Sequence, residues 1–231
     1  NDSDADGDTL TVSIANGPSA GSAVVNNKSI EFTPPAAMTG TYTVDYDVSD
    51  GTTSTQGTVT FNVMATASAP SAAGDVVITE IMQNPSTLGD SEGEYFEIYN
   101  ASGAPLELDG CTVSDDGSDS FTIDFSLRIA DQGRAVLGRS INVGVVPGYV
   151  WPSTSLSNGA DEVVVTCSST EIDRVNYDGG TNFPDPTGAS MTLDPSARDA
   201  TSNDTGSNWC EATSSFNGDL GTPGAANDTC P

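Results

Sequence analysis

The chain has 231 residues, with 33 acidic and 6 basic side chains and a formal net charge of −27. Such a charge repels phosphate groups, which excludes nucleic acids and anionic membrane surfaces as partners. Histidine is absent, which excludes Ser–His–Asp and Cys–His catalysis, and no apolar run reaches the 18 residues of a membrane span.

Short alternating segments fill the first 64 residues. Apolar and polar residues that alternate with a period of two are typical of half-buried β-strands. The predicted strands cover residues 10–14, 22–26, 29–33, 41–48 and 57–64. Residues 65–74, "ATASAPSAAG", are small and unpatterned, so they are predicted to form a linker between two domains.

A second series of segments of the same kind begins at residue 75. Its predicted strands cover residues 76–82, 94–100, 105–114, 121–126, 134–138, 161–167, 171–177 and 189–194. Helical periodicity is absent between them, so the chain is predicted to be all-β, with two antiparallel β-sandwich domains in tandem. From residue 178 the chain is rich in Gly, Pro, Asn and Ser, and Trp209 and Phe216 are predicted to anchor this tail on the second domain.

The four cysteines indicate disulfides. Without histidine, a zinc site requires closely spaced cysteine pairs, and these cysteines lie far apart in the sequence. Two disulfides imply export to an oxidising compartment. Three pairings are possible. The favoured pairing joins Cys111 to Cys167, both in predicted strands, and Cys210 to Cys230, which bracket the tail.

The opening "DSDADGD" has the D-x-D-x-D-G pattern of the first half of a calcium-binding loop. The twelfth loop position is Ser13 instead of glutamate, and a strand follows instead of a helix, which excludes an EF-hand. A calcium site at one end of the sandwich is predicted instead, and the alternative is a hydrated turn without an ion. The predicted ligands are Asp2, Asp4, Asp6, Asp8 and Asp50.

Two further acidic segments and one aromatic pair have structural interpretations. Residues 114–119, "SDDGSD", are predicted to form a hairpin turn, with a calcium site as the lesser alternative. The carboxylates in residues 89–97 are predicted to lie on the polar face of a strand. The alternative is a pair of catalytic carboxylates, as in glycoside hydrolases. Tyr149 and Trp151 are predicted to cap the core, and a sugar-stacking platform is the alternative.

Longer motifs carry two family resemblances. "NDSDADGDTLTVSI", "IEFTPPAAMTGTYTVDYDVSDG" and "GTVTFNV" make residues 1–64 similar to a bacterial cadherin-like Ig repeat. That resemblance implies that the module lacks its opening strand, which either an upstream segment or a neighbouring chain would supply. "VVITEIMQNPS", "GEYFEIYNASGAPLELDGCTVSDDG" and the closing "GTPGAAN" make residues 75–227 resemble a secreted bacterial lamin-tail domain, which implies an Ig-like sandwich without catalytic residues.

These observations together predict a non-catalytic, calcium-stabilised structural or adhesive module that is secreted or displayed on a bacterial cell surface. The expected partners are other protein chains, copies of the chain itself or cell-surface polysaccharide. Two alternatives stay open. The chain is an accessory targeting module of a larger secreted nuclease or glycosidase, or a filament subunit that assembles by donating a strand to the next copy.

Overall fold

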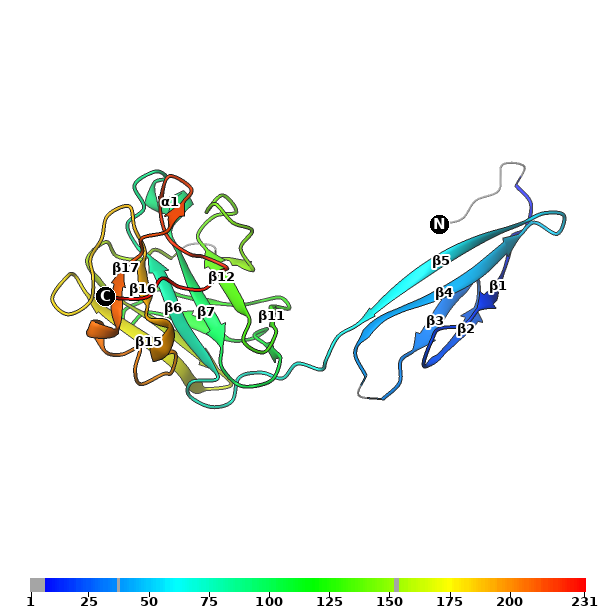
Figure 1. Ribbon diagram of the computed structural model, residues 1–231, viewed down its shortest axis with the longest axis horizontal. Coiled ribbons are helices and arrows are strands. Elements are labelled where there is room, and N and C mark those ends of the chain that lie inside the picture. The colour runs from blue at the N-terminus through cyan, green and yellow to red at the C-terminus, as the bar shows by residue number, and fades with distance from the viewer. Residues whose placement is uncertain (1–6, 37, 152–153) are drawn as a thin grey trace. The chain divides into compact units, whose positions relative to one another are not determined.

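The computed structural model describes residues 7–36, 38–151 and 154–231 (Figure 1). The chain divides into two compact units, Asn1–Thr66 and Ala67–Pro231, which we call the first unit and the second unit. Both are built almost entirely of antiparallel strands, which confirms the all-β prediction. Among the described residues, no helix is long and apolar enough to cross a membrane.

The second unit begins earlier than the predicted residue 75. Ser68 donates its backbone N–H to the carbonyl of Pro105 and accepts a hydrogen bond from the N–H of Glu107. Further along, the carboxylate of Asp75 accepts hydrogen bonds from the N–H groups of Ser71 and Ala72. Residues 67–74 therefore belong to the second unit, to which the backbone of Ser68 and Gly74 is hydrogen-bonded, although their composition is that of a linker.

In the first unit, a three-stranded sheet in the order β1-β4-β5 faces a separate β2-β3 hairpin (Figure 1). The strands are β1 (Thr11–Asn16), β2 (Ser22–Asn26), β3 (Ser29–Thr33), β4 (Gly40–Ser49) and β5 (Ser54–Val63). Asn27 and Lys28 connect the hairpin with φ of 48° and 70°, the backbone region that a two-residue turn of type I′ requires.

The first unit has a small hydrophobic core. Phe32 of the hairpin packs on Tyr42 and Phe61 of the sheet, with ring centroids 5.1 and 5.0 Å apart. Among the described residues of this unit, only Tyr42 and Val44 are fully buried apolar side chains. Val24, on the free side of the hairpin, is 55% exposed, so the first unit depends on a small core.

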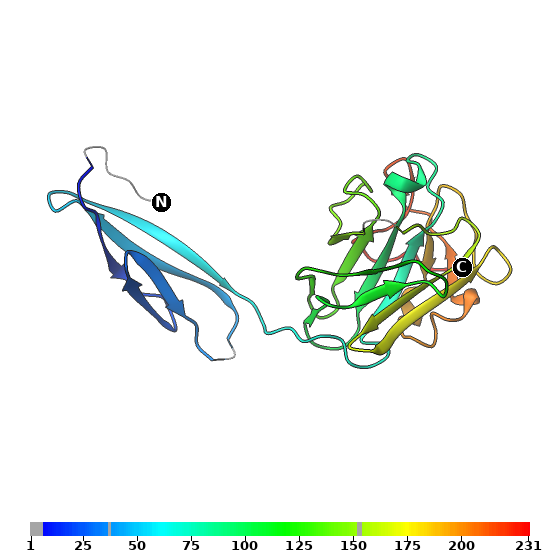
Figure 2. The same cartoon turned by 180° about the vertical axis from the view of Figure 1, so that it is seen from behind.

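The second unit is a sandwich of a six-stranded sheet and a four-stranded sheet (Figure 2). The larger sheet has the order β13-β12-β7-β6-β16-β17, and its pairs are antiparallel except for β12 with β13. It comprises β6 (Val76–Met82), β7 (Tyr95–Asn100), β12 (Arg134–Gly138), β13 (Tyr149–Val150), β16 (Met191–Leu193) and β17 (Trp209–Glu211). The smaller sheet, in the order β10-β9-β14-β15, comprises β9 (Thr112–Ser114), β10 (Ser120–Thr122), β14 (Ala160–Cys167) and β15 (Thr170–Asp178).

Several short elements differ from the predicted boundaries. The predicted strand 105–114 forms two strands, β8 (Leu106–Glu107) and β9, and the turn between them contains Gly110 with a φ of 84°. Outside the two main sheets lie β11 (Arg128–Ile129), which pairs with β8, the hairpin of β18 (Ser215–Phe216) and β19 (Asp219–Leu220), and the one-turn helix α1 (Asp90–Gly93). None of these four carries enough residues for a recognisable period, so the sequence did not predict them.

The core between the two sheets contains a continuous series of stacked aromatic rings. Trp151 stacks on Phe96 and Phe121 with centroids 5.5 and 5.8 Å apart, and Phe121 stacks on Tyr149 at 5.6 Å. Trp151 and Tyr149 are 2% and 5% exposed. The prediction that these two rings cap the core is therefore confirmed, and the alternative of a sugar-stacking platform is wrong because the rings are covered.

Candidate functional site

The predicted calcium ligands lie partly outside the described residues. Asp2, Asp4 and Asp6 precede the first described residue, and Asp8 is exposed. Within residues 7–36, 38–151 and 154–231, no three acidic or cysteine side chains come together in a way that could hold a metal ion. The calcium site therefore stays a prediction.

Asp50, the fifth predicted ligand, lies in the turn between β4 and β5. Its Oδ1 accepts hydrogen bonds from the N–H groups of Thr52 and Thr53 at 2.6 and 2.7 Å, and its Oδ2 accepts one from the Thr53 hydroxyl at 2.8 Å. These bonds, led by the one from the Thr53 backbone, hold the pKa of Asp50 well below its usual range. The carboxylate is thus ionised and already has a structural role in its own turn.

The acidic segment 114–119 forms the predicted hairpin turn between β9 and β10. Asp115 accepts hydrogen bonds from the N–H groups of Gly117 and Asp119, both at 2.9 Å. Asp116 receives two hydrogen bonds of 3.1 Å from the guanidinium of Arg174 on β15. Intrachain donors therefore satisfy these carboxylates.

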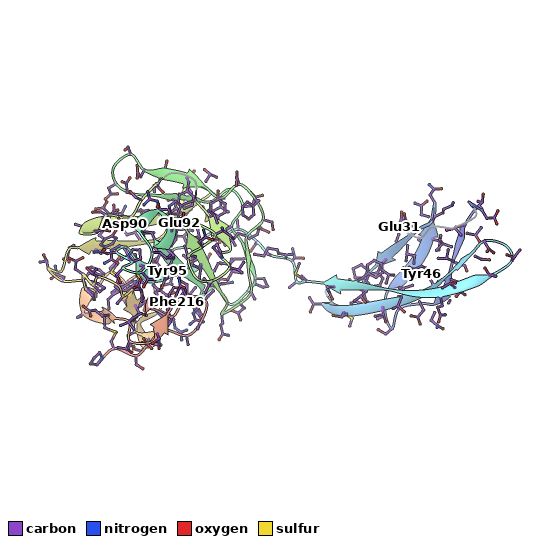
Figure 3. All side chains as sticks on the ribbon, turned by 90° about the horizontal axis from the view of Figure 1, so that it is seen from above. Glu31, Tyr46, Asp90, Glu92, Tyr95 and Phe216 are labelled. Carbon is purple, nitrogen blue, oxygen red and sulfur yellow. A yellow bond between two sulfur atoms is a disulfide. The ribbon has the colours of Figure 1, made fainter. Side chains whose placement is uncertain are left out.

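The segment 89–97 distributes its carboxylates between surface and core. Asp90 and Glu92 lie on α1 (Figure 3), where Glu92 accepts hydrogen bonds from Ser140 and Asn142, both at 2.8 Å. Glu94 is fully buried, and its Oε2 accepts hydrogen bonds of 3.0 Å from Arg139 and from the N–H of Leu156. Burial raises the pKa of Glu94 to about 7.

Two glutamates lie directly opposite each other on β6 and β7. Glu80 and Glu97 form a register pair and are both fully buried. Glu80 Oε1 accepts hydrogen bonds from the hydroxyl of Tyr95 at 2.8 Å, the hydroxyl of Ser190 at 2.6 Å and the N–H of Thr222 at 2.7 Å. Its Oε2 accepts one from the Thr222 hydroxyl at 2.9 Å. Four intrachain donors therefore hold this one carboxylate.

Glu97 binds the same C-terminal segment at Gly224, two residues after the Thr222 that Glu80 binds. Its Oε2 accepts a hydrogen bond of 2.7 Å from the N–H of Gly224, and its Oε1 accepts one of 2.8 Å from the Thr79 hydroxyl. Arg134 forms an ion pair with it at 3.2 Å. Burial, followed by the neighbouring Glu80, raises the pKa of Glu97 to about 7.

We call Glu80, Glu97 and the segment 221–224 that they hold the carboxylate clasp. Close approach within it requires glycine at position 221, where a Cβ would lie 2.5 Å from the Tyr95 hydroxyl and 3.0 Å from Glu80 Oε1. A glycosidase pair must face a bound sugar, whereas these two buried carboxylates accept hydrogen bonds from the protein's own N–H and O–H groups. The two glutamates therefore attach the C-terminal segment to the large sheet.

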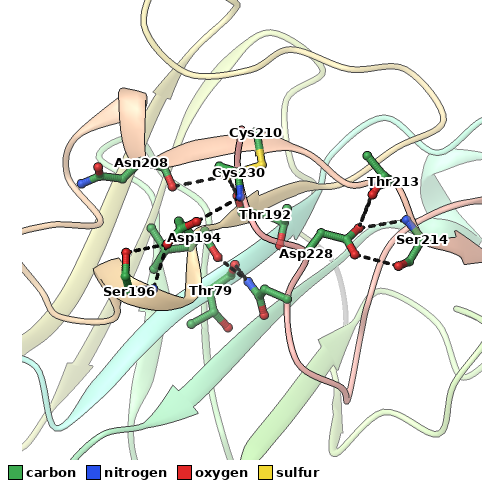
Figure 4. Close-up of a disulfide and its surroundings, with 12 residues drawn as sticks. Thr79, Thr192, Asp194, Ser196, Asn208, Cys210, Thr213, Ser214, Asp228 and Cys230 are labelled. Atoms are coloured by element: carbon green, nitrogen blue, oxygen red, sulfur yellow. Dashed lines mark hydrogen bonds between the residues drawn. A yellow bond between two sulfur atoms is a disulfide. The ribbon is translucent and has the colours of Figure 1, made fainter.

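The rest of the tail is fastened by side-chain and covalent links (Figure 4). Asp228 accepts hydrogen bonds from the N–H groups of Thr213 and Ser214 at 2.6 and 2.9 Å. A disulfide joins Cys210 of β17 to Cys230 (Figure 4), and the N–H of Cys230 donates to the carboxylate of Asp194 at 3.0 Å. The tail thus lies on the second unit, as we predicted from its anchors Trp209 and Phe216. The disulfide between Cys210 and Cys230 is also the pairing that the sequence favoured.

The other disulfide joins Cys111 to Cys167 within the smaller sheet. It continues the register in which Thr112 of β9 pairs with Thr166 of β14, so it links neighbouring strands of one sheet. Both cysteines are 1% exposed and belong to the core. The bridge therefore joins the two inner strands of the smaller sheet covalently at one end.

A buried aspartate connects the two sheets at another point. Asp173 of β15 accepts hydrogen bonds from the N–H of Ile78 on β6 at 2.6 Å and from the side-chain amide of Asn203 at 2.7 Å. Asn203 in turn accepts a hydrogen bond of 2.7 Å from the indole N–H of Trp209 through its backbone carbonyl. Burial raises the pKa of Asp173 to about 7.

The sequence analysis missed Glu80, Asp173 and their partners in the tail. One signal was available, because a single acidic residue interrupts the apolar run "VVITEIM". Buried carboxylates require nearby donors, so Glu80 in that run indicates a polar partner from elsewhere. The partner itself, Thr222, is 142 positions away and no local pattern could have identified it.

Raising the pH from about 5 to about 8 is expected to lower the melting temperature of the second unit by about 4 °C or more. Glu94, Glu97 and Asp173 have a pKa of about 7 when folded, but about 4 when unfolded. Each binds its proton more tightly in the folded state, so its stabilising contribution is complete at low pH and is lost as the pH rises through about 7. Calorimetry at fixed ionic strength measures this, and Glu97→Gln should flatten the dependence. A melting temperature that rises over this interval would contradict the prediction.

Two antiparallel sandwich-type units in tandem, the second fixed by two disulfides, define the class as Ig-like β-modules. Residues 1–63 match the family model of the bacterial Ig domain, and residues 69–179 match that of the Lamin Tail Domain. The chain thus carries a bacterial Ig domain followed by a lamin tail domain, in the predicted order. The lamin-tail match ends at residue 179, so it includes Glu80 and Glu97 but not β16, β17 or the segment 221–224 that these glutamates hold. No curated protein and no solved structure matches the chain.

Proposed function

We propose that the chain is a non-catalytic structural or adhesive part of a secreted or surface-displayed bacterial protein, and that calcium stabilises its first unit. The observation that carries the extracellular part is the pair of disulfides in the second unit, because such bonds persist in oxidising compartments. The match to a bacterial Ig domain supports the same location.

The chemistry of the acidic residues supports the non-catalytic part. Clefts that perform acid–base catalysis keep carboxylates within reach of a substrate. Here the buried carboxylates of Glu80, Glu97 and Asp173 accept hydrogen bonds from the protein's own N–H and O–H groups. Their role is therefore to join segments of the fold, which is what a structural module requires.

Calcium is proposed from the D-x-D-x-D-G pattern around Asp2, Asp4 and Asp6, with Asp8 and Asp50 as further oxygen donors. Extracellular sites of this kind bind with dissociation constants of about 10⁻⁴–10⁻³ M. Calcium at about 10 mM would then add about 1–3 kcal/mol to a folded state that holds the ion.

Adding calcium to about 10 mM is expected to raise the melting temperature of the first unit by about 5–15 °C over the value in EDTA. Calorimetry of the full chain measures both units in one scan. Asp4→Ala should abolish the increase, whereas Asp47→Ala, which removes an acidic residue of β4 in the same unit, should retain it. A first-unit melting temperature that is the same in calcium and in EDTA would show that the calcium part is wrong.

A further inference from the structure

A hollow of about 450 Å³ lies in the second unit. Three segments line it. They are the end of β7 with the loop that follows, the turn before β12, and the one-turn 3₁₀ segment Pro195–Ala197 with the two residues after it. Its volume lies within the range of about 300–1,000 Å³ that small-molecule sites occupy.

Hydrogen bonds of the buried residue Asn100 fix two of these walls. The side-chain amide of Asn100 donates to the carbonyls of Ala104, Ile129 and Ala130 at 2.7–3.0 Å. Its backbone carbonyl accepts a hydrogen bond of 3.1 Å from the N–H of Gln132. Because one buried side chain holds both loops, the hollow is formed before any ligand arrives.

The third wall is fixed by its own aspartates. Asp194 caps the 3₁₀ segment by accepting hydrogen bonds from the N–H and the hydroxyl of Ser196. Asp199 accepts hydrogen bonds from the N–H groups of Thr201 and Ser202 at 3.0 and 2.9 Å. Between them, Arg198 donates its Nε–H to the carbonyl of Pro195 at 2.9 Å. The guanidinium is therefore held at one point of the wall.

Arg198 is unusual among the arginines of this acidic chain. The other four form ion pairs, Arg128 with Glu107, Arg134 with Glu97, Arg139 with Glu94 and Arg174 with Asp116. In the part of the chain that the structure describes, Arg198 forms none, although acidic residues outnumber basic ones by 33 to 6. Its guanidinium lies over the ring of Tyr99, 4.7 Å from the centroid. A cation that is positioned in this way keeps its terminal N–H groups available for a ligand.

The same hollow presents acceptors beside this donor. Asp131, Gln132 and Asp199 all line it. Gln132 has a φ of 58°, which costs energy for a residue with a side chain and is often found at functional positions. A guanidinium beside carboxylate and amide oxygens matches neighbouring hydroxyl groups, each of which donates one hydrogen bond and accepts others.

We propose that this hollow binds a neutral saccharide unit, with Arg198 donating to ring hydroxyls and Asp131, Gln132 and Asp199 accepting from them. One guanidinium faces two carboxylates in a chain of charge −27, so carboxylated and sulfated sugars are disfavoured. The inference rests on the proposed extracellular function, for which it names the class of partner.

Saturation-transfer NMR and titration of the full chain test the site. The probes are the methyl glycosides of glucose, galactose, mannose and N-acetylglucosamine, with methyl glucuronide as the anionic comparison. At least one neutral glycoside is expected to bind with a dissociation constant of about 1–10 mM. Arg198→Ala should weaken that binding about tenfold, and Arg174→Ala, on the smaller sheet, should leave it unchanged.

Gln132→Gly provides a variant that retains the fold, because glycine accepts the positive φ at this position without strain. It removes the amide from the hollow and should weaken binding about threefold or more. The proposal is overturned if no neutral glycoside binds, if Arg198→Ala and Gln132→Gly bind as well as the parent chain, or if methyl glucuronide binds most tightly. None of these outcomes affects the calcium response of the first unit, so the two failures are distinguishable.

Discussion

Replacing Glu80 with alanine is expected to lower the free energy of unfolding of the second unit by about 3–5 kcal/mol. The substitution removes the acceptor for Tyr95, for Ser190 and for both donor groups of Thr222, all of them in the buried part of the carboxylate clasp. Donors that lose their acceptor in the interior cost more than the average worth of a hydrogen bond, since water cannot replace the lost partner.

Guanidinium denaturation followed by tryptophan fluorescence measures this loss, because Trp151 and Trp209 both belong to the core of the second unit. Glu211→Ala is the matched control, as Glu211 is an exposed glutamate on β17 and should change stability by less than about 0.5 kcal/mol. A loss at Glu80 no larger than that at Glu211 would mean that the clasp does not hold the tail.

Removing the disulfide between Cys111 and Cys167 by a double alanine substitution is expected to cost about 4 kcal/mol, because the bridge closes a loop of 56 residues. Both side chains are buried in the core, so the lost sulfurs also leave unfilled space. The corresponding substitution at Cys210 and Cys230, separated by 20 residues and partly exposed, should cost about 3 kcal/mol.

The more specific part of the prediction is that the Cys111–Cys167 variant loses more stability than the Cys210–Cys230 variant. Denaturation of both double variants and of the parent chain measures the two losses in the free energy of unfolding. A larger cost for Cys210 and Cys230 would show that the tail, and not the smaller sheet, depends most on its covalent link. Equal melting of the parent chain with and without a reducing agent would contradict both values.

The sequence predicted those parts of the fold in which local pattern and final environment agree. Strands β2, β3, β6 and β12 have the predicted bounds, since each is a run of apolar or alternating residues ended by turn-forming residues. The two disulfides were also predictable, because strand assignment and position along the chain favoured one of three pairings.

What the sequence could not show depends on distant contacts. All seven residues of β6 are buried, because the smaller sheet covers one face and the C-terminal segment supplies partners on the other. That segment is poor in apolar residues. Its strand β16 lies within the predicted strand 189–194, but β17 has only three residues, which is too short for a period. Glu80 and Thr222 therefore meet through the fold of the entire second unit.

The position of the Cys210–Cys230 bridge has a mechanical consequence. A pulling force applied at Pro231 reaches Cys230 after one residue and passes through the sulfur bridge directly to β17. Residues 211–229, which include the segment held by Glu80 and Glu97, then carry no tension. The load is instead borne by β17 and β16, so the hydrogen bonds of the clasp are shielded from stretching for as long as the cystine is intact.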